Sequence, residues 1–338
     1  MGGSKLGRRL VIAMLFGVAV YGVLVFYRGA EKIGQELATF AWSTFAIACG
    51  LSFVNYVLRF LKWEYYLKIL DIRGVPKPTS FFTFLSGFVL TVTPGKVGEV
   101  FKSLILQQVR GIPVERTASI VVAERVTDLI GVILLIAIGS FRFPGGIVWM
   151  SAGLLLVMAI LVMVSSPRVA DAVVRGLPRL PGALGRIGAR VATKMAEAFD
   201  RLRTITTPRR LVWPTLLSVV GWGLEGVGLW LILRGFGQDA PLELTAFFYA
   251  TATLAGAIFP VPGGLGVTDK LLEEQMARLG GVPAAKATSA MLLARFATLW
   301  FAVIVGFIAL AILRAMYPSL RAAPAPAARE SVDNQGAT

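Results

Sequence analysis

The sequence predicts an all-α polytopic membrane protein, and three properties of its composition support that fold class. Hydrophobic residues make up 56% of the 338 residues and charged residues only 16%, a balance too apolar for a soluble domain. The apolar residues form runs of the length that crosses a bilayer. The formal net charge of +15 comes from Lys and Arg residues that collect between these runs. It therefore indicates contacts with anionic lipid head groups and not with nucleic acid.

The residue types that most enzymes and metal sites need are scarce. The chain has no histidine, which removes the commonest metal ligand and general base. Its single cysteine, Cys49, allows neither an intramolecular disulfide nor a cysteine-based metal site. We therefore expect no metal and no cofactor, and a transporter rather than an enzyme.

Six apolar runs are long enough to cross the membrane as helices, since a crossing needs about 17–25 apolar residues. They lie at 10–27, 37–58, 118–140, 147–164, 211–233 and 287–313. The first run follows Lys5, Arg8 and Arg9 but lacks the small-residue cleavage site of a signal peptide, so we expect it to be retained as a helix.

Two further apolar stretches, 79–92 and 244–259, are too short to cross, and each ends in a Pro/Gly break followed by an amphipathic segment. The sequence therefore predicts two re-entrant helical hairpins, at 79–110 and 244–280. The first break reads TPGKVGE and the second VPGGLGV, which matches Pro94, Gly95 and Gly98 to Pro262, Gly263 and Gly266. A Gly-x-Pro turn follows each hairpin, at Gly111 and Gly281.

The two halves of the chain share one order of elements: span, span, hairpin, span. This order predicts about six crossings and two hairpins in two repeats of inverted topology. Short Gly/Pro matches of this kind could also arise by chance. The predicted domains are a first repeat at 1–166, a cytoplasmic amphipathic linker at 167–210, a second repeat core at 211–314 that also uses 147–164, and a disordered cytoplasmic tail at 315–338. The first hairpin would enter from the cytoplasm and the second from outside. Most of the 34 Lys and Arg residues would then lie inside, which places both termini in the cytoplasm of a cell-membrane protein.

Charged residues follow the first break. Lys96, Glu99 and Lys102 recur every three residues, so they lie near one face of the returning helix, whose first N–H groups suit an anion such as phosphate. The simpler alternative is that the lysines reach surface head groups and Glu99 pairs with one of them.

The next span opens with two acids and one base, Glu124, Arg125 and Asp128. We expect the surplus acid to pair with Lys96 or Lys102. These charges could equally be packing ion pairs with no role in transport.

The second break begins a helix that carries Asp269 and Lys270, and Arg295 projects from the last span. Glu225 is an isolated acid in an apolar span. It could neutralise Arg295 or Lys270, or serve as a proton-coupling carboxylate.

Arg59, Lys62 and Lys68 leave the second span among Trp63, Tyr65 and Tyr66. This composition is typical of an interfacial belt, so we interpret these cations as membrane anchors, with Asn55 a candidate extension of the polar lining.

These residues resemble the lysylphosphatidylglycerol synthetase transmembrane, or flippase-like, family. The resemblance rests on residues 93–99 with Lys102, on Glu124 and Arg125 with Asp128, and on residues 260–266. It implies a lipid-handling membrane domain, which in some members is joined to an aminoacyl-transferase domain and flips its lipid product. Family members often carry Glu where this chain has Asp269. Only a short tail follows residue 313, so we expect no transferase domain here.

The leading hypothesis is a translocator of a phosphate-bearing lipid, such as an anionic or aminoacylated phospholipid or a polyprenyl-phosphate lipid, working by alternating access. One alternative is a membrane-embedded lipid-modifying transferase that uses Glu99, Glu124 or Asp128 as a base. Another is a non-catalytic accessory subunit of a glycosyltransferase or aminoacyl-lipid synthetase. Such an enzyme and a second copy of the chain are the candidate protein partners. The expected head-group contacts are Pro94, Gly95, Lys96, Gly98, Glu99, Lys102, Glu124, Arg125, Asp128, Pro262, Gly263, Gly264, Gly266, Asp269, Lys270 and Arg295.

Overall fold

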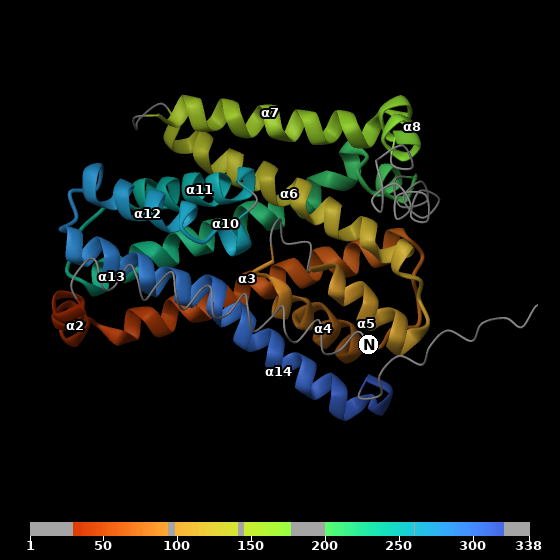
Figure 1. The fold of residues 1–338 in the computed structure, drawn as a ribbon, viewed down its shortest axis with the longest axis horizontal. Helices are drawn as coiled ribbons and strands as arrows, with labels where there is room; N and C mark the ends of the chain where they lie inside the picture. Colours follow the sequence, from red (N-terminus) through yellow and green to blue (C-terminus); the bar gives the residue numbers. More distant parts are fainter. Residues whose placement is uncertain (1–29, 94–98, 141–144, 177–199, 260, 321–338) are drawn as a thin grey trace, which may run out of the picture.

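The computed structural model describes residues 30–93, 99–140, 145–176, 200–259 and 261–320, and within these ranges every regular element is a helix (Figure 1). The predicted span at 10–27, residues 177–199 of the predicted linker and the tail from 321 lie outside the described residues. The same holds for four predicted site residues of the first break, namely Pro94, Gly95, Lys96 and Gly98.

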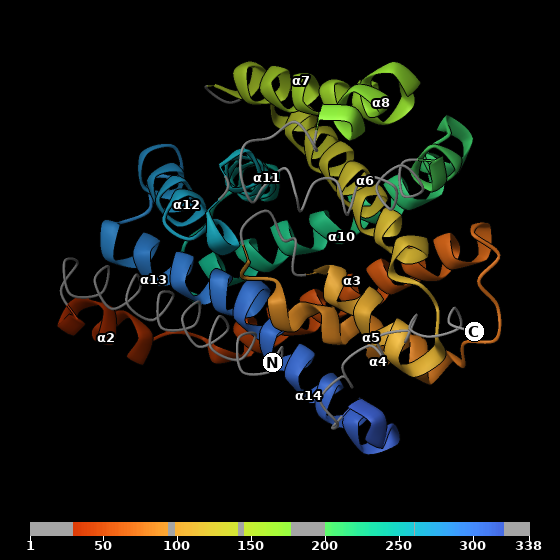
Figure 2. The same ribbon diagram turned by 45° about the vertical axis from the view of Figure 1, so that its right-hand side comes forward.

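Long helices cover the other predicted spans. They are α3 (Trp42–Ile69), α6 (Val114–Ser140), α7 (Gly146–Ser165), α10 (Pro208–Gly235), and the continuous pair α13 (Ala284–Arg295) and α14 (Phe301–Met316). Among the described residues, three helical stretches are long and apolar enough to cross a membrane by length and composition: Trp42–Ile69, Pro208–Gly235 and Ala284–Met316. Helix α7 lies at the edge of the bundle beside α6, followed by α8 (Pro167–Gly176), in both views (Figures 1 and 2).

The second span differs from its prediction in a way that changes the site. Instead of one run at 37–58, the chain forms a short α2 (Ala30–Ala38) and then α3, which continues to Ile69. Arg59 is 8% exposed and Lys62 is 0% exposed, so the interpretation of these two cations as interfacial anchors was wrong. Trp63 and Tyr66 are fully buried as well, whereas Lys68 is exposed.

Each predicted hairpin is a pair of helices on either side of a break. The first runs through α4 (Lys77–Ser86) and the 3-10 turn η1 (Gly87–Leu90) and returns as α5 (Phe101–Arg110). The second runs through α11 (Leu242–Ile258) and η4 (Pro262–Gly264) and returns as α12 (Val267–Arg278). The hairpins occupy opposite ends of the bundle, and α3 and α10 run in opposite directions (Figure 1).

The turns after the two hairpins share one backbone conformation. Gly111 has φ +68° and Gly281 has φ +64°, a left-handed geometry that favours glycine. Gly111 caps the end of α5, whereas Gly281 lies in the turn that follows Leu279, the cap of α12. The Gly-x-Pro similarity in the sequence therefore corresponds to a similarity in structure.

The ends of the two hairpins touch. Val92, at the end of the first, packs with Leu265 of the second and with Leu299 and Val303. Gly263 (φ +59°) lies so close that a Cβ atom there would stand 3.4 Å from Val92 Cγ1. The end of the first hairpin's entering arm thus meets the second break in the interior of the bundle.

Gly306 permits the close packing of α14 on η1. A Cβ atom at this position would lie 2.6 Å from the backbone nitrogen of Val89, so Gly306→Ala must push the two elements apart. We expect a loss of about 1–3 kcal/mol in the free energy of unfolding, seen as a lower melting temperature in detergent. The matched control is Gly50→Ala in α3, where nothing lies within 4 Å. Equal melting temperatures for the two variants would show that this contact is not tight.

Candidate functional site

A cavity of about 250 Å³ lies where the two hairpin ends meet. Its wall is formed by α3, α6, α10, α11, both breaks and the segment after α13. Apolar side chains make up part of the wall. Its polar and charged residues are Asn55, Tyr56, Arg59, Thr91, Thr93, Arg125, Asp128, Glu225, Tyr249, Thr253, Thr268, Arg295 and Thr298.

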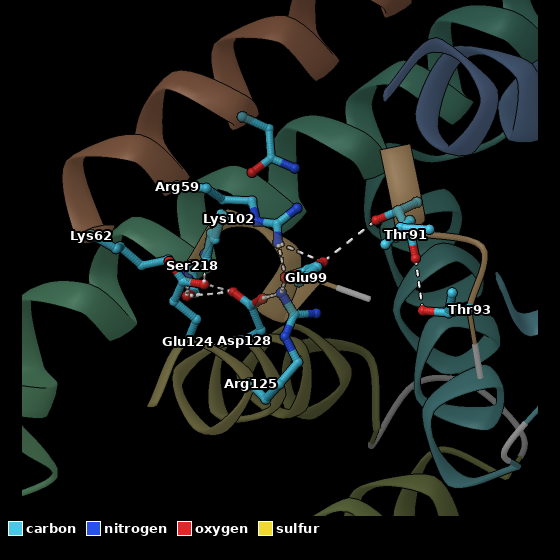
Figure 3. A network of polar contacts seen from close by, with 12 residues as sticks. Arg59, Lys62, Thr91, Thr93, Glu99, Lys102, Glu124, Arg125, Asp128 and Ser218 are labelled. Atoms are coloured by element: carbon cyan, nitrogen blue, oxygen red, sulfur yellow. Dashed lines mark hydrogen bonds and ion pairs between the residues drawn. The ribbon is translucent and has the colours of Figure 1, made fainter. Parts of the chain in front are cut away.

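Two arginines converge on Glu99 at the edge of this cavity (Figure 3). Arg59 of α3 donates from Nη2 to both carboxylate oxygens of Glu99, at 3.2 Å each, and Arg125 of α6 donates to Oε2 at 2.9 Å. Thr91 of the first break points its hydroxyl at the same carboxylate, at 3.5 Å. Glu99 is 1% exposed, whereas the Arg125 side chain is 23% exposed.

Lys62 and Asp128 form a second pair next to the first. The Lys62 ammonium lies 2.5 Å from Asp128 Oδ1 and 2.8 Å from the hydroxyl of Ser218 on α10, which itself donates to Asp128 at 3.0 Å. Arg125 approaches the other oxygen of Asp128 at 3.2 Å. This buried ion pair, with Ser218, thus joins α3, α6 and α10.

Lys102 and Glu124 form a third pair behind the cavity wall. Their N–O distance is 2.6 Å, and the ammonium also lies 4.6 Å from the ring centre of Trp63 and 4.9 Å from that of Phe84. The predicted pairing of a surplus acid with Lys102 is confirmed. This lysine is 1% exposed and does not line the cavity, so its ammonium serves the packing of α5 on α6.

The arrangement leaves hydrogen-bond donors at the cavity. Among the described residues, four cations (Arg59, Lys62, Lys102, Arg125) share three acids (Glu99, Glu124, Asp128), and Glu225 in the same cavity wall balances the remaining positive charge. The Nε atoms of Arg59 and Arg125 are buried and have no hydrogen-bond partner among the described residues. A buried donor without a partner costs about 1–3 kcal/mol, so these two N–H groups suit an anionic ligand.

The second half ties its hairpin to the next helix in the same way. Arg295, at the end of α13, lies 2.7 Å from Asp269 of α12 and donates to the carbonyl oxygen of Gly263 in the break. Asp269 in turn accepts the N–H of Gly266 at 2.8 Å, which fixes the start of α12. A π-helical segment, η5 (Phe296–Trp300), follows Arg295 directly, and its Thr298 and Leu299 line the cavity. Such π-segments often mark functional sites.

Glu225 is the acid that α10 contributes to the cavity wall. Its two carboxylate oxygens accept hydrogen bonds from Ser52 and Asn55 of α3, both at 2.8 Å. It is 4% exposed.

The structure brings together most of the predicted site residues that it describes. Glu99, Glu124, Arg125, Asp128 and Lys102 form one network, and Gly263, Gly264 and Arg295 line the same cavity. Lys270 and Gly266 are exposed and do not line it. Within the described ranges, no three acidic, histidine or cysteine side chains gather as metal ligands.

Sequence reasoning missed Arg59 and Lys62, which the structure places at the centre of the network. A signal was present, because Ser52, Asn55, Arg59 and Lys62 recur at helical spacing and form one polar stripe along α3.

Comparison with known proteins agrees with this architecture. The family model described as the lysylphosphatidylglycerol synthase TM region matches residues 11–306. Two proteins from Methanothermobacter thermautotrophicus, both named UPF0104 membrane protein, are similar along most of their length. The first is 25% identical to this chain over an alignment that covers 86% of this chain and 91% of the relative. The second is 24% identical over an alignment that covers 84% of this chain and 88% of the relative. Because the family model covers most of the chain and the helices are long and apolar, the protein is an integral membrane protein that belongs to the lysylphosphatidylglycerol synthase TM region family.

Proposed function

We propose that the protein translocates a phosphate-bearing membrane lipid by binding its head group in the cavity between the two hairpin ends. The observation that carries this proposal is the pair of guanidinium groups of Arg59 and Arg125, which line the cavity and hold buried Nε–H donors without a partner. Guanidinium groups suit phosphate because their planar donors match its oxygens. The acyl chains would stay in the surrounding lipid.

The proposed topology has about six crossings with both termini in the cytoplasm, in two inverted repeats whose hairpins are re-entrant. Three observations support it. Helices α3 and α10 run in opposite directions (Figure 1), a left-handed glycine lies in the turn after each hairpin, and an acid near the start of each returning helix (Glu99 or Asp269) pairs with an arginine of the next helix. Rocking of one repeat against the other would open the cavity to each side in turn.

The pairing of the acids favours transport over catalysis. Glu99, Glu124 and Asp128 each contact a lysine or arginine, a role of counter-charges that hold hairpin and helix together. A general base for a lipid transferase would instead need an acid that can reach and accept a substrate proton. We therefore favour the translocator over the membrane-embedded transferase.

Reconstitution of the purified chain in liposomes tests the proposal. Phosphatidylglycerol labelled with a fluorophore on one acyl chain should cross to the other leaflet faster with the protein than without it, measured by chemical quenching of the outer leaflet. Glucosylceramide with the same label has no phosphate and is the matched control, and it should cross equally slowly in both cases. Equal rates for labelled phosphatidylglycerol with and without protein would contradict the proposal. Transport by the chain alone would also show that no synthetase or glycosyltransferase partner is required.

A further inference from the structure

Helices α6 and α11 form one side of the cavity wall, and α7 covers the join between them at one level. Gly153 of α7 packs directly on this join. A Cβ atom there would lie 2.6 Å from Ile133 Cγ1 of α6 and 3.0 Å from Leu254 Cδ2 of α11. Ile133 is 8% exposed and Leu254 is 0% exposed. The cavity is therefore closed to the outside of the bundle at the level of Gly153.

The same wall becomes exposed away from Gly153. Towards the start of α6, Leu129 is half-buried and the Arg125 side chain is 23% exposed, and both line the cavity. One turn beyond Leu254 on α11, Ala257 also lines the cavity and is exposed. We call the opening between Leu129, Arg125 and Ala257 the mouth of the cavity.

The surface around the mouth is apolar. Val122, on the same face of α6 as Arg125 and Leu129, is 37% exposed. Ile258 and Phe259 follow Ala257 at the end of α11 and are 40% and 54% exposed. These three side chains lie outside the cavity lining, so they are exposed on the outer surface of the bundle.

The depth of the mouth favours lipid over water as its surroundings. At about 1.5 Å per residue, Arg125 lies about 16 Å along α6 from Val114, and Phe259 lies about 25 Å along α11 from Leu242. In the proposed topology both helices start at a membrane surface, so the mouth lies inside a hydrocarbon core of about 30 Å. Exposed valine, isoleucine and phenylalanine side chains at this depth contact acyl chains.

We propose that the lipid enters and leaves the cavity sideways through this mouth, with its acyl chains against Val122, Ile258 and Phe259 while its phosphate binds Arg125. This inference rests on the proposed function, which supplies the phosphate-bearing head group in the cavity. Arg125 belongs to both surfaces, because its guanidinium lies on Glu99 and its side chain is partly exposed at the mouth. The phosphate of a glycerophospholipid is separated from the acyl chains only by glycerol. A phosphate at Arg125 therefore places the chains at the apolar rim, and the occupant is a lipid with acyl chains and not a soluble phosphate.

Filling the mouth tests the route. Ala257→Trp places a large ring between α6 and the end of α11, and it should slow the crossing of labelled phosphatidylglycerol in liposomes by about tenfold or more. The matched control is Ala46→Trp, at an exposed alanine of α3 that does not line the cavity, and it should move the lipid at the wild-type rate. The melting temperature in detergent shows that both variants are folded. Equal rates for the two folded variants would overturn the inference.

Cross-linking locates the acyl chains without depending on transport or on a bulky substitution in the cavity wall. The photoreactive residue p-benzoyl-phenylalanine is placed at Phe259, or at Phe307 of α14 as the matched control, which is 39% exposed and lies outside the cavity lining. The membrane holds equal amounts of phosphatidylglycerol and glucosylceramide. Position 259 should react preferentially with phosphatidylglycerol, and Arg125→Gln should abolish that preference, whereas position 307 should show none. Equal reaction of both lipids at position 259 would overturn the inference.

The two proposals fail in different ways. Lipid crossing by the wild type without a preference at position 259 overturns the lateral mouth and leaves the proposed function standing. A preference at position 259 without lipid crossing overturns the proposed function and leaves the mouth as a lipid-binding site. The absence of both overturns both.

Discussion

Lys62→Met is expected to lower the free energy of unfolding by about 3–5 kcal/mol, the largest effect of any single change considered for this protein. Lys62 is 0% exposed, and its ammonium contacts Asp128 at 2.5 Å and Ser218 at 2.8 Å. Methionine keeps the length of the side chain but removes the charge, so one partner of a buried carboxylate is lost. The contact that joins α3 to α6 and α10 would be lost with it.

The measurement is thermal unfolding of the purified variant in detergent. Lys68→Met is the matched control, because Lys68 lies on the same helix and is exposed, and we expect its effect to stay within about 0.5 kcal/mol. Adding Asp128→Asn to Lys62→Met should recover part of the loss, since the carboxylate left behind is then neutral. A Lys62→Met protein as stable as the control would contradict the proposed role of the pair.

Arg125→Gln should slow lipid crossing by about tenfold to hundredfold, because one charge-assisted hydrogen bond contributes about 1.5–3 kcal/mol. Arg125 is the more exposed of the two arginines on Glu99, and its Nε–H has no partner among the described residues. The substitution leaves Glu99 with Arg59 and leaves Asp128 with Lys62, so the fold should persist.

The liposome assay with labelled phosphatidylglycerol gives the rate. Arg110→Gln removes an exposed arginine at the end of α5, outside the cavity lining, and should move the lipid at the wild-type rate. Arg125→Lys keeps the charge but not the planar donors, so its rate of lipid crossing should lie between those of the wild type and Arg125→Gln. Equal rates for Arg125→Gln and Arg110→Gln would show that the guanidinium does not contact the head group.

Much of the helical framework could be predicted because its signals are local. Long apolar runs predicted the helices at 118–140, 147–164, 211–233 and 287–313, and Pro/Gly breaks predicted where α4 and α11 turn back. The pairing of Lys102 with Glu124 could also be predicted, since only 22 residues and one turn separate them.

The rest of the site depends on which helices pack against each other, and a single sequence does not reveal those contacts. Arg59 contacts Glu99, 40 residues away in the sequence, and Ser52 contacts Glu225, 173 residues away. The aromatic residues beside Arg59 and Lys62 suggested a membrane interface, although the same aromatic residues pack in the core. The polar stripe of α3 was the better signal, because a row of four polar residues on one face of an apolar helix needs polar partners inside the protein.

Native mass spectrometry of lipids retained by the purified protein tests the central claim most directly. The wild type should carry a phosphate-bearing lipid, and Arg59→Gln combined with Arg125→Gln should lose it while remaining folded by circular dichroism. The Arg110→Gln protein should retain it. Equal retention of phosphate-bearing lipid by wild type and the double variant would contradict the claim that the two guanidinium groups between the hairpin ends hold the head group.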